Sequence, residues 1–299
     1  MHLNYPYKII EYQNNTRGIK PLISVIVLTY NHENYIKECL DGILAQLTNF
    51  EVEIIVGEDD SNDKTRKICL DYAEKHPNKI RLIFHSEKNK IYINNKKTGR
   101  FNFLYNYNIS RGKYIALCEG DDYWTNPHKL QKQVDFLEAN PDYALCFHEV
   151  QIKEEATGGL IEDNITRKVP DTTDIRDLAR GNYIHTPSVV FRNNFSLPDW
   201  FSECTMGDWP LYCVLTGNKK IKKLSDVMAV YRSHPDSMWS AKDKSSRIRN
   251  SLHTYRLVLN SGILNPEAKA ILQASVKNLQ NQLPKQPSWV HRLKTFLKT

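Results

Sequence analysis

Three carboxylates lie within four residues in the segment Glu119-Gly120-Asp121-Asp122, directly after the apolar run at 114–118. Their mutual repulsion destabilises a protein unless a cation or basic groups neutralise them. Oxygen ligands that leave room for water and phosphate are typical of Mg²⁺ and Mn²⁺ sites, in which the metal also contacts a diphosphate. The segment therefore indicates a divalent metal site. A solvated acidic turn before a helix is the alternative.

A second acidic segment, Glu58-Asp59-Asp60-Ser61-Asn62-Asp63, follows the apolar run at 52–56 and leads into a predicted helix. Asp63 or Ser61 could cap that helix, which is the simplest explanation for one or two of these residues. Capping does not require the two carboxylates that open the segment at the end of the strand. A carboxylate there could accept the imide N–H of uracil or thymine, so the segment predicts a nucleotide site.

Polar residues at the end of the first apolar run offer further contacts for a nucleotide. Thr29-Tyr30-Asn31 ends that run, and Glu33 follows in the next turn. Neither GxGxxG nor GxxxxGK[ST] follows the run, which argues against Rossmann dehydrogenases and P-loop NTPases. The phosphates of a bound nucleotide must then be met by a metal and by side chains.

Alternating strand and helix patterns position these segments. Short β-branched apolar runs predict strands at 22–30, 52–56, 80–84 and 114–118, and helical spacing predicts helices at 35–46, 65–75, 101–109 and 127–138. Such alternation predicts an α/β protein with a mostly parallel, doubly wound sheet that binds ligands at the carboxyl ends of its strands. Both acidic segments fall at such ends.

The pattern loosens after about residue 150. It predicts shorter strands at 187–191 and 227–233, a helix at 208–215, and two last helices at 246–259 and 266–283. We expect an N-terminal arm at 1–20, a catalytic α/β body at 21–240 and a helical C-terminal extension at 241–299. Within the body, 21–125 would be the nucleotide-binding half and 126–240 the acceptor half.

Composition narrows the class of protein. The chain has 299 residues, a net charge of +7 and 40% hydrophobic residues, which is typical of a soluble globular protein. Its 6 Cys are scattered, so neither a disulfide framework nor a zinc site is expected. The longest apolar run is too short to cross a bilayer and no secretory leader opens the chain, which favours a cytoplasmic location. The small basic excess suits the phosphates of a nucleotide, and no nucleic acid partner is predicted.

These motifs together resemble those of the inverting family 2 glycosyltransferases of the GT-A fold, in the form common among bacterial surface-polysaccharide enzymes. Ser24-Val-Ile-Val-Leu-Thr-Tyr-Asn31 matches the opening strand, and 58–63 lies where the family has an Asp-Asp-Gly-Ser-Thr-Asp-like loop. Glu119-Gly120-Asp121-Asp122-Tyr123-Trp124, followed by Lys129-Leu130-Gln131, looks like the DxD motif. Gly207-Asp208-Trp209-Pro210-Leu211 is similar to the (E/G)-D-W segment, and Tyr231-Arg232-Ser233-His234 resembles the terminal strand.

The resemblance implies roles for individual residues. Asp208 would be the general base, and Asp121 would bind the metal together with Asp122 and His234. Glu119, which stands where the family has the first Asp of DxD, would contact the ribose or the metal beside Gly120. From local sequence alone, a helix N-cap is the alternative for Asp208, and an exposed turn is the alternative for His234.

The family loop that carries Gly and Arg-Asn corresponds to Thr98-Gly99-Arg100-Phe101-Asn102. Arg100 is displaced by one position from the pattern, and we expect Arg100 and Asn102 to contact the donor. His185 and Trp239 could line an acceptor cleft, and ordinary packing is the alternative for both.

The activity that the resemblance implies is metal-dependent, inverting transfer of a sugar from a UDP- or dTDP-type nucleotide sugar. The cofactor would be Mn²⁺ or Mg²⁺, and the acceptor would be a hydroxyl of a glycan or lipid-linked glycan. Two other classes stay open. A sugar-nucleotide nucleotidyltransferase would usually have a Gly-rich, basic loop after the first strand, which this chain lacks. A non-catalytic carbohydrate-binding protein would leave the carboxylate cluster unexplained.

The last residues, 288–299, form a basic amphipathic pattern. Wound as a helix, Trp289, Leu293, Phe296 and Leu297 would share one face, with basic residues around it. Such a face suits weak attachment to an anionic bilayer, here the inner face of the plasma membrane. Docking of the same face on the body of the protein is the alternative.

Overall fold

The computed structural model describes residues 7–12, 15–16, 18, 20–235, 237 and 242–284. Two sequence predictions, the acceptor role of Trp239 and the amphipathic tail at 288–299, therefore lie outside the described residues. None of the described helices is long and apolar enough to cross a membrane.

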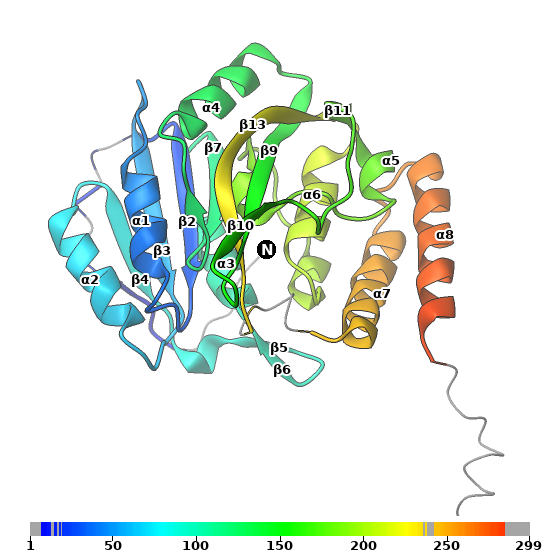
Figure 1. The fold of residues 1–299 in the computed structure, drawn as a ribbon, viewed down its shortest axis with the longest axis horizontal. Coiled ribbons are helices and arrows are strands. Elements are labelled where there is room, and N and C mark those ends of the chain that lie inside the picture. The colour runs from blue at the N-terminus through cyan, green and yellow to red at the C-terminus, as the bar shows by residue number, and fades with distance from the viewer. Residues whose placement is uncertain are drawn as a thin grey trace, which may run out of the picture.

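One large sheet runs through the centre of the molecule, and helices cover both of its faces (Figure 1). Its strand order is β1-β4-β3-β2-β7-β12-β9-β13-β11, with β8 paired to β13 and β10 paired to β9. The long strands all run in one direction: β2 (Ile23–Thr29), β3 (Val52–Glu58), β4 (Ile80–Phe84), β7 (Tyr114–Glu119), β9 (Tyr143–Glu154) and β13 (Lys220–Ser233). The predicted mostly parallel α/β sheet is confirmed.

The shorter strands run antiparallel to their neighbours at the edges and at one internal position. They are β1 (Ile10–Tyr12), β8 (Tyr123–Trp124), β10 (Gly159–Glu162), β11 (Thr172–Thr173) and, between β7 and β9, β12 (Val190–Arg192). A separate hairpin is formed by β5 (Ile91–Ile93) and β6 (Lys96–Thr98).

Two apolar cores sandwich the sheet because successive side chains of a strand point to opposite faces. In β2, Val25 and Val27 pack under α1 (Ile36–Leu44), α2 (Thr65–Lys75) and α4 (Lys129–Ala139). Ile26 belongs to the opposite core, beneath five other helices: α3 (Arg100–Asn108), α5 (Ile175–Leu178), α6 (Asp208–Thr216), α7 (Lys244–Asn260) and α8 (Pro266–Gln282).

The last two helices share this second core. Tyr255 of α7 and Leu272 of α8 are buried in it, and the Tyr255 ring lies 4.3 Å from the ring of Trp209 on α6. Figure 1 shows α7 and α8 beside α5 and α6 on the same flank. The described part of the region predicted as a C-terminal extension, 242–284, is thus mainly helical and packs on the body.

The second half of the sheet is longer than the sequence pattern indicated. β9 was not predicted, and β13 begins at Lys220 instead of Val227. The early part of β13 carries lysines with exposed or half-exposed side chains, so it lacks an apolar run. It is a strand because it pairs in parallel with β9 along its whole length. The predicted strand at 187–191 is also corrected: η2 (Thr186–Ser188) is a 3-10 turn, and β12 follows it.

The carboxyl ends of three neighbouring strands meet at one edge of the sheet. Thr29 of β2 lies opposite Glu58 of β3, and Leu28 lies opposite Glu119 of β7. The two acidic segments found in the sequence are therefore brought to the same edge, on either side of the turn that follows β2.

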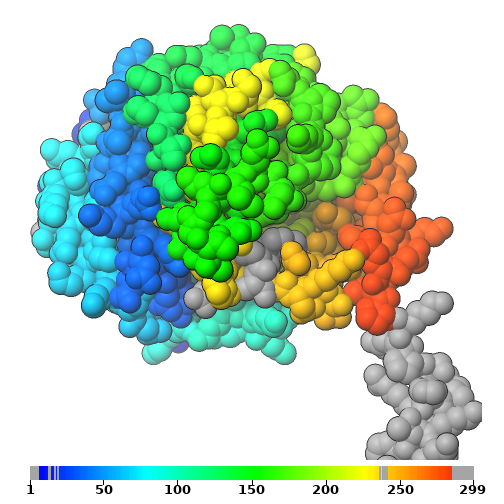
Figure 2. All heavy atoms as spheres, in the orientation of Figure 1, coloured from blue at the N-terminus to red at the C-terminus, as the bar shows by residue number. Residues whose placement is uncertain are grey.

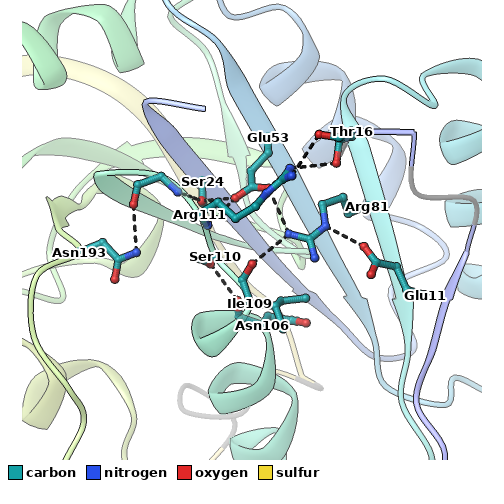
Figure 3. Close-up of polar contacts among 11 residues, drawn as sticks. Glu11, Thr16, Ser24, Glu53, Arg81, Asn106, Ile109, Ser110, Arg111 and Asn193 are labelled. Atoms are coloured by element: carbon teal, nitrogen blue, oxygen red, sulfur yellow. Dashed lines mark hydrogen bonds and ion pairs between the residues drawn. The ribbon is translucent and has the colours of Figure 1, made fainter. Parts of the chain in front are cut away.

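A buried ion network lies at the opposite, amino-terminal edge (Figure 3). Glu53, the second residue of β3, is 1% exposed and accepts hydrogen bonds from Ser24 Oγ at 2.6 Å and from the Arg111 backbone at 2.7 Å. The guanidinium groups of Arg81 and Arg111 contact its other oxygen at 3.1 and 2.6 Å. Arg81 also binds Glu11 at 2.7 Å, so the network fastens the N-terminal strand to the sheet.

We expect Glu53→Gln to lower the free energy of unfolding by about 3 kcal/mol, because it leaves the buried guanidinium group of Arg81 without its buried counter-charge. Urea unfolding measures this, and Glu51→Gln, at an exposed position two residues earlier, is the control. Burial raises the pKa of Glu53, but the Ser24 and Arg111 hydrogen bonds and the Arg81 charge outweigh it and the pKa lies below its ordinary value.

The sign of the pH effect follows from that direction. A carboxyl group with a depressed folded-state pKa stabilises the fold above its unfolded pKa, about 4.3 for glutamate, and this stability is lost as the pH falls below it. The stability difference between the parent and Glu53→Gln should therefore shrink as the pH drops from about 5 towards 3. A difference that stays constant over that range would contradict the ionised role of Glu53.

Candidate active site

The acidic loop after β7 brings three carboxylates together. One oxygen from each of Glu119, Asp121 and Asp122 lies within 4.8 Å of the others. Gly120 lets this loop approach the end of β2, because a Cβ at Gly120 would lie 2.7 Å from Thr29 Oγ1 and 2.8 Å from His32 Nδ1. The cluster is thus built against the turn that follows the first parallel strand.

Asp122 is the most deeply buried of the three carboxylates. Its Oδ1 accepts a hydrogen bond from the Arg232 backbone of β13 at 2.8 Å. Its buried Oδ2 has no hydrogen-bond partner among the residues that the structure describes. Burial, followed by the charges of Asp121 and Glu119, raises the pKa of Asp122 well above its ordinary value. An unpartnered, buried carboxylate oxygen beside two further carboxylates fits a divalent cation.

Asp121 faces two histidines. Its Oδ2 lies 3.1 Å from His234 Nε2 and 3.9 Å from His32 Nε2. Burial raises the pKa of Asp121, but the hydrogen bond with His234 and the charge of the nearby His32 lower it by more. The pKa of Asp121 is therefore below its ordinary value. His234 is buried and packs on Tyr35 at 5.0 Å between ring centroids, which differs from the exposed turn considered as its alternative.

Sequence reasoning missed His32, although it lies in the turn at 31–33 that was singled out. An imidazole directly after the end of a parallel strand was the available signal. Its ring also lies 3.3 Å from Thr29 Oγ1, and its backbone N–H donates to Thr65 Oγ1 at 2.7 Å. His32 is therefore held by both β2 and the start of α2.

Glu119 is close enough to both Asp121 and Asp208 for their charges to act on it. Burial, then the charges of Asp121 and Asp208, raises the pKa of Glu119 to about 8. The two motifs that the sequence placed almost 90 positions apart therefore feel each other electrostatically at one site.

Asp208 is the first residue of α6, and Gly207 occupies the N-cap position. The Asp208 side chain accepts a hydrogen bond from Asn182 Nδ2 at 2.6 Å. Burial raises the pKa of Asp208. The backbone N–H of Trp209 and the charges of Arg100 and His185 lower it by less, so the pKa stays above its ordinary value. A half-buried carboxylate with a raised pKa can hold or accept a proton beside the acidic loop.

Arg100 supports the loop that leads to Asp208. It is buried, donates from Nη2 to the Cys204 carbonyl at 2.9 Å and to the Met206 carbonyl at 2.8 Å, and lies over the Phe201 ring. Burial lowers the pKa of Arg100 to about 10. The Arg100 side chain, which was predicted to contact the nucleotide sugar, thus binds backbone carbonyl groups of the protein.

Asp59 lies where β3 ends, in the segment predicted to bind the nucleotide. It is 4% exposed, and its Oδ1 finds no hydrogen-bond partner within the described part of the chain. Lys90 Nζ lies 3.6 Å from its Oδ2 and 3.8 Å from the centroid of the exposed Tyr30 ring. Burial raises the pKa of Asp59 to about 7, against the lowering effect of Lys90. No local pattern in the sequence singled out Lys90.

Other predicted nucleotide contacts hold the two loops in place. Glu58 is fully buried and accepts from the Ser61 backbone and from Arg66 Nε, both at 2.6 Å. Asn31 accepts from the Asn62 backbone at 2.8 Å, and Glu33 accepts from the Lys64 backbone at 3.0 Å.

Two further predicted residues also have internal partners. Asn102 is buried behind β3 and donates to the Gly57 carbonyl at 2.8 Å. Asp63, considered as a helix cap, accepts from the Thr65 backbone at 2.9 Å and so does bind the start of α2.

A third histidine, His185, also lies beside a carboxylate. His185 Nε2 lies 3.0 Å from Asp163 Oδ2, and the His185 ring packs 4.9 Å from the Tyr231 ring. Figure 2 shows the green surface of the β9–β10 region beside the yellow surface of β13. The His185 side chain is 9% exposed, and its charge lowers the pKa of Asp208, so the two side chains lie near each other.

Comparison with known proteins gives a consistent picture. The sequence profile of glycosyl transferase family 2 matches residues 24–195. An uncharacterized protein of Mycobacterium tuberculosis is 36% identical over 223 residues, which cover 73% of this chain and 60% of that protein. The minor teichoic acid biosynthesis protein GgaB of Bacillus subtilis is 26% identical over 267 residues, which cover 85% of this chain and 28% of GgaB. The chain thus spans 60% or less of the length of these two relatives.

Solved structures share the fold. A 1–349 fragment of Staphylococcus aureus TarS in complex with UDP-GlcNAc has a TM-score of 0.60 at 20% identity and covers 86% of this chain and 72% of its own. Mannosyltransferase PcManGT from Pyrobaculum calidifontis, in complex with GDP-Man and Mn²⁺, has a TM-score of 0.58 at 16% identity. The match covers 99% of this chain and 84% of that chain. Because the family profile covers more than half of a chain with this GT-A architecture, the chain belongs to glycosyltransferase family 2.

Proposed function

We propose that this family 2 glycosyltransferase moves a sugar from a nucleoside-diphosphate sugar to an acceptor hydroxyl, with a divalent metal and with inversion at the anomeric carbon. The observation that carries the proposal is the convergence of the carboxylates of Glu119, Asp121 and Asp122 with His234 beside Asp208. The UDP-GlcNAc and GDP-Man in the complexes of two structural neighbours support this class of donor.

Asp59 and Tyr30 bind the base of the donor in this proposal. The unpartnered buried oxygen of Asp59 accepts an imide N–H, which uracil and thymine both have, and the exposed Tyr30 ring lies beside it under Lys90. A UDP- or dTDP-type donor follows from this pairing. Thr29, Asn31 and Glu33 shape the adjoining turn.

Asp121, Asp122 and His234 hold the metal, Mn²⁺ or Mg²⁺, and Glu119 faces the ribose or the metal. Carboxylate and imidazole ligands of this kind suit Mn²⁺, and the Mn²⁺ in the complex of one structural neighbour is consistent with that choice. When bound, the metal supplies charge that stabilises the departing diphosphate.

Asp208 takes the proton of the acceptor hydroxyl as its oxygen forms a bond to the anomeric carbon. The bond between that carbon and the diphosphate breaks in the same step, and its electron pair leaves with the diphosphate. One in-line displacement inverts the anomeric configuration and requires no covalent intermediate with the enzyme.

The acceptor in this proposal is a glycan or lipid-linked glycan of a bacterial surface polysaccharide, built at the cytoplasmic side of the membrane. The similarity to a minor teichoic acid biosynthesis protein supports this setting. The basic tail at 288–299 would supply weak contact with an anionic membrane.

Calorimetry with UDP, dTDP and GDP, with and without Mn²⁺, tests the donor class. We expect Mn²⁺-dependent binding of a nucleoside diphosphate, and then slow, Mn²⁺-dependent hydrolysis of one sugar in a panel of UDP-GlcNAc, UDP-glucose, dTDP-glucose and GDP-mannose. Proton NMR of the sugar as it is first released reports inversion. Binding of UTP with a sugar 1-phosphate would instead identify a nucleotidyltransferase, and binding of glycans without nucleotide would identify a carbohydrate-binding protein.

Asp59→Ala should raise the KM of the donor roughly tenfold or more with little change in kcat, because it removes a hydrogen bond made equally in the ground and transition states. The parent should bind UDP more tightly than CDP, whose base lacks the imide N–H, and the variant should lose that preference. Asp135→Ala, at an exposed position on α4, is the control. Collapse of kcat alone would assign Asp59 to the chemistry instead of to base binding.

A further inference from the structure

Asn182 is hydrogen-bonded at both ends of its amide. Its Oδ1 accepts from the backbone N–H of Tyr183 at 2.9 Å and of Ile184 at 3.1 Å, and its Nδ2 donates to Asp208 Oδ2 at 2.6 Å. An amide oxygen cannot donate, so the two backbone N–H groups fix which end of the amide is which. The NH₂ group must face Asp208.

The segment that carries Asn182 is fixed relative to α6. Leu178, at the end of α5, accepts a hydrogen bond from Trp209 Nε1 at 2.9 Å, and Trp209 directly follows Asp208. Tyr183 is buried, and its hydroxyl pairs with Thr173 Oγ1 at 2.8 Å. The donor and acceptor of the Asn182–Asp208 bond therefore belong to two segments that cannot move apart without breaking buried contacts.

We infer that Asn182 is a positioning residue for Asp208: its amide holds Oδ2 and so fixes the orientation in which the carboxylate takes the proton of the acceptor. The inference rests on the proposed role of Asp208 as the base. A hydrogen bond to an ionised carboxylate is stronger than one to a neutral group, so the same contact also favours the ionised form that a base requires. Asn182 touches neither the acidic loop nor Asp59 through any contact that the structure records, so donor binding should not depend on it.

Two substitutions separate the donor function of Asn182 from its role in the turn. Asn182→Ser keeps a hydroxyl that can accept from the following backbone N–H groups, but it is too short to reach Asp208. Asn182→Asp keeps the accepting oxygen and places a carboxylate where the NH₂ group stood, against Asp208. Asn194→Asp is the matched control, because Asn194 is exposed.

The measurement is steady-state release of nucleoside diphosphate, with Mn²⁺, from whichever sugar the parent hydrolyses fastest among UDP-GlcNAc, UDP-glucose, dTDP-glucose and GDP-mannose. We expect kcat to fall about tenfold in Asn182→Ser and more in Asn182→Asp, with the donor KM within about twofold of the parent. Because Asn182 acts only through Asp208, Asn182→Ser should add no further loss to Asp208→Asn.

The outcomes separate this inference from the proposed function. If Asp208→Asn loses turnover and both Asn182 variants keep the parent's kcat, the positioning role is wrong and the base assignment stands. A further loss when Asn182→Ser is added to Asp208→Asn would also overturn it, because Asn182 would then act by another route. If Asp208→Asn itself keeps full turnover, the base assignment fails first, and the positioning role fails with it.

Discussion

Asp208→Asn should reduce turnover by roughly 10² or more and leave the affinity for the donor nucleotide unchanged. The substitution keeps the shape of the side chain and an oxygen that can face Asn182, but it removes the carboxylate proposed to take the proton of the acceptor. A base acts only in the transition state, so its loss appears in kcat and not in ground-state binding.

Parallel measurements of UDP binding by calorimetry and of donor hydrolysis test this expectation. The variant should bind UDP with Mn²⁺ as the parent does, and circular dichroism should show an unchanged thermal transition. Asp135→Asn, an exposed substitution of the same kind on α4, controls for the loss of a carboxylate. An active Asp208→Asn enzyme with an unaltered pH dependence would reduce Asp208 to a structural residue at the start of α6.

Asp121→Ala should abolish detectable transfer and remove the Mn²⁺ dependence of nucleoside diphosphate binding. Asp121 lies at the centre of the cluster, since its Oδ2 faces His234 and His32 while Glu119 and Asp122 flank it. Asp121→Ala removes the carboxylate whose pKa lies below its ordinary value, so the site would no longer hold the metal. The negative charge of the diphosphate would then not be neutralised by a cation.

Titration of UDP into the variant with and without Mn²⁺ is the direct measurement. We expect the same weak binding in both conditions, whereas the parent should bind more tightly with Mn²⁺. Asp142→Ala is a suitable control, because Asp142 is exposed and pairs only with Lys220 among the contacts recorded for its side chain. Binding of UDP and Mn²⁺ as tight as in the parent would move the metal site away from Asp121.

Local pattern determined the first half of the fold and the location of its acidic segments. The strands in the first half of the chain are short, buried and rich in β-branched residues, so their apolar runs are visible without any partner strand. α2 and β4 occur at the predicted residues, and β2, β3 and β7 lie within two residues of them. Because parallel strands end at one edge of a sheet, the same pattern predicts that 58–63 and 119–122 lie at the same edge.

The tertiary structure alone decided which polar residues are free to act. Glu58 and Asn102 are as polar as Asp59, but each is already bound to backbone or to a buried partner, whereas Asp59 keeps an oxygen for which the described residues offer none. Sequence shows the type of a side chain and not what lies against it. Lys90 is 31 residues from Asp59 in the sequence, so its place above Tyr30 could not be read from any local spacing.

The second half of the sheet and the contacts of the proposed base also depended on long-range pairing. β9 and β13 stabilise each other although their first residues are separated by 77 positions. The lysines at the start of β13 interrupt the apolar pattern from which a strand could have been predicted. Asn182 and Asp208 meet because α5, α6 and the start of β13 pack on the same core. The sequence by itself determined the class of chemistry, since residue types at strand ends limit what a site can bind. The tertiary structure decided which carboxylate is hydrogen-bonded, which keeps an oxygen without a partner and which is held in a fixed orientation. Burial and hydrogen bonding depend on neighbouring groups that only folding brings together.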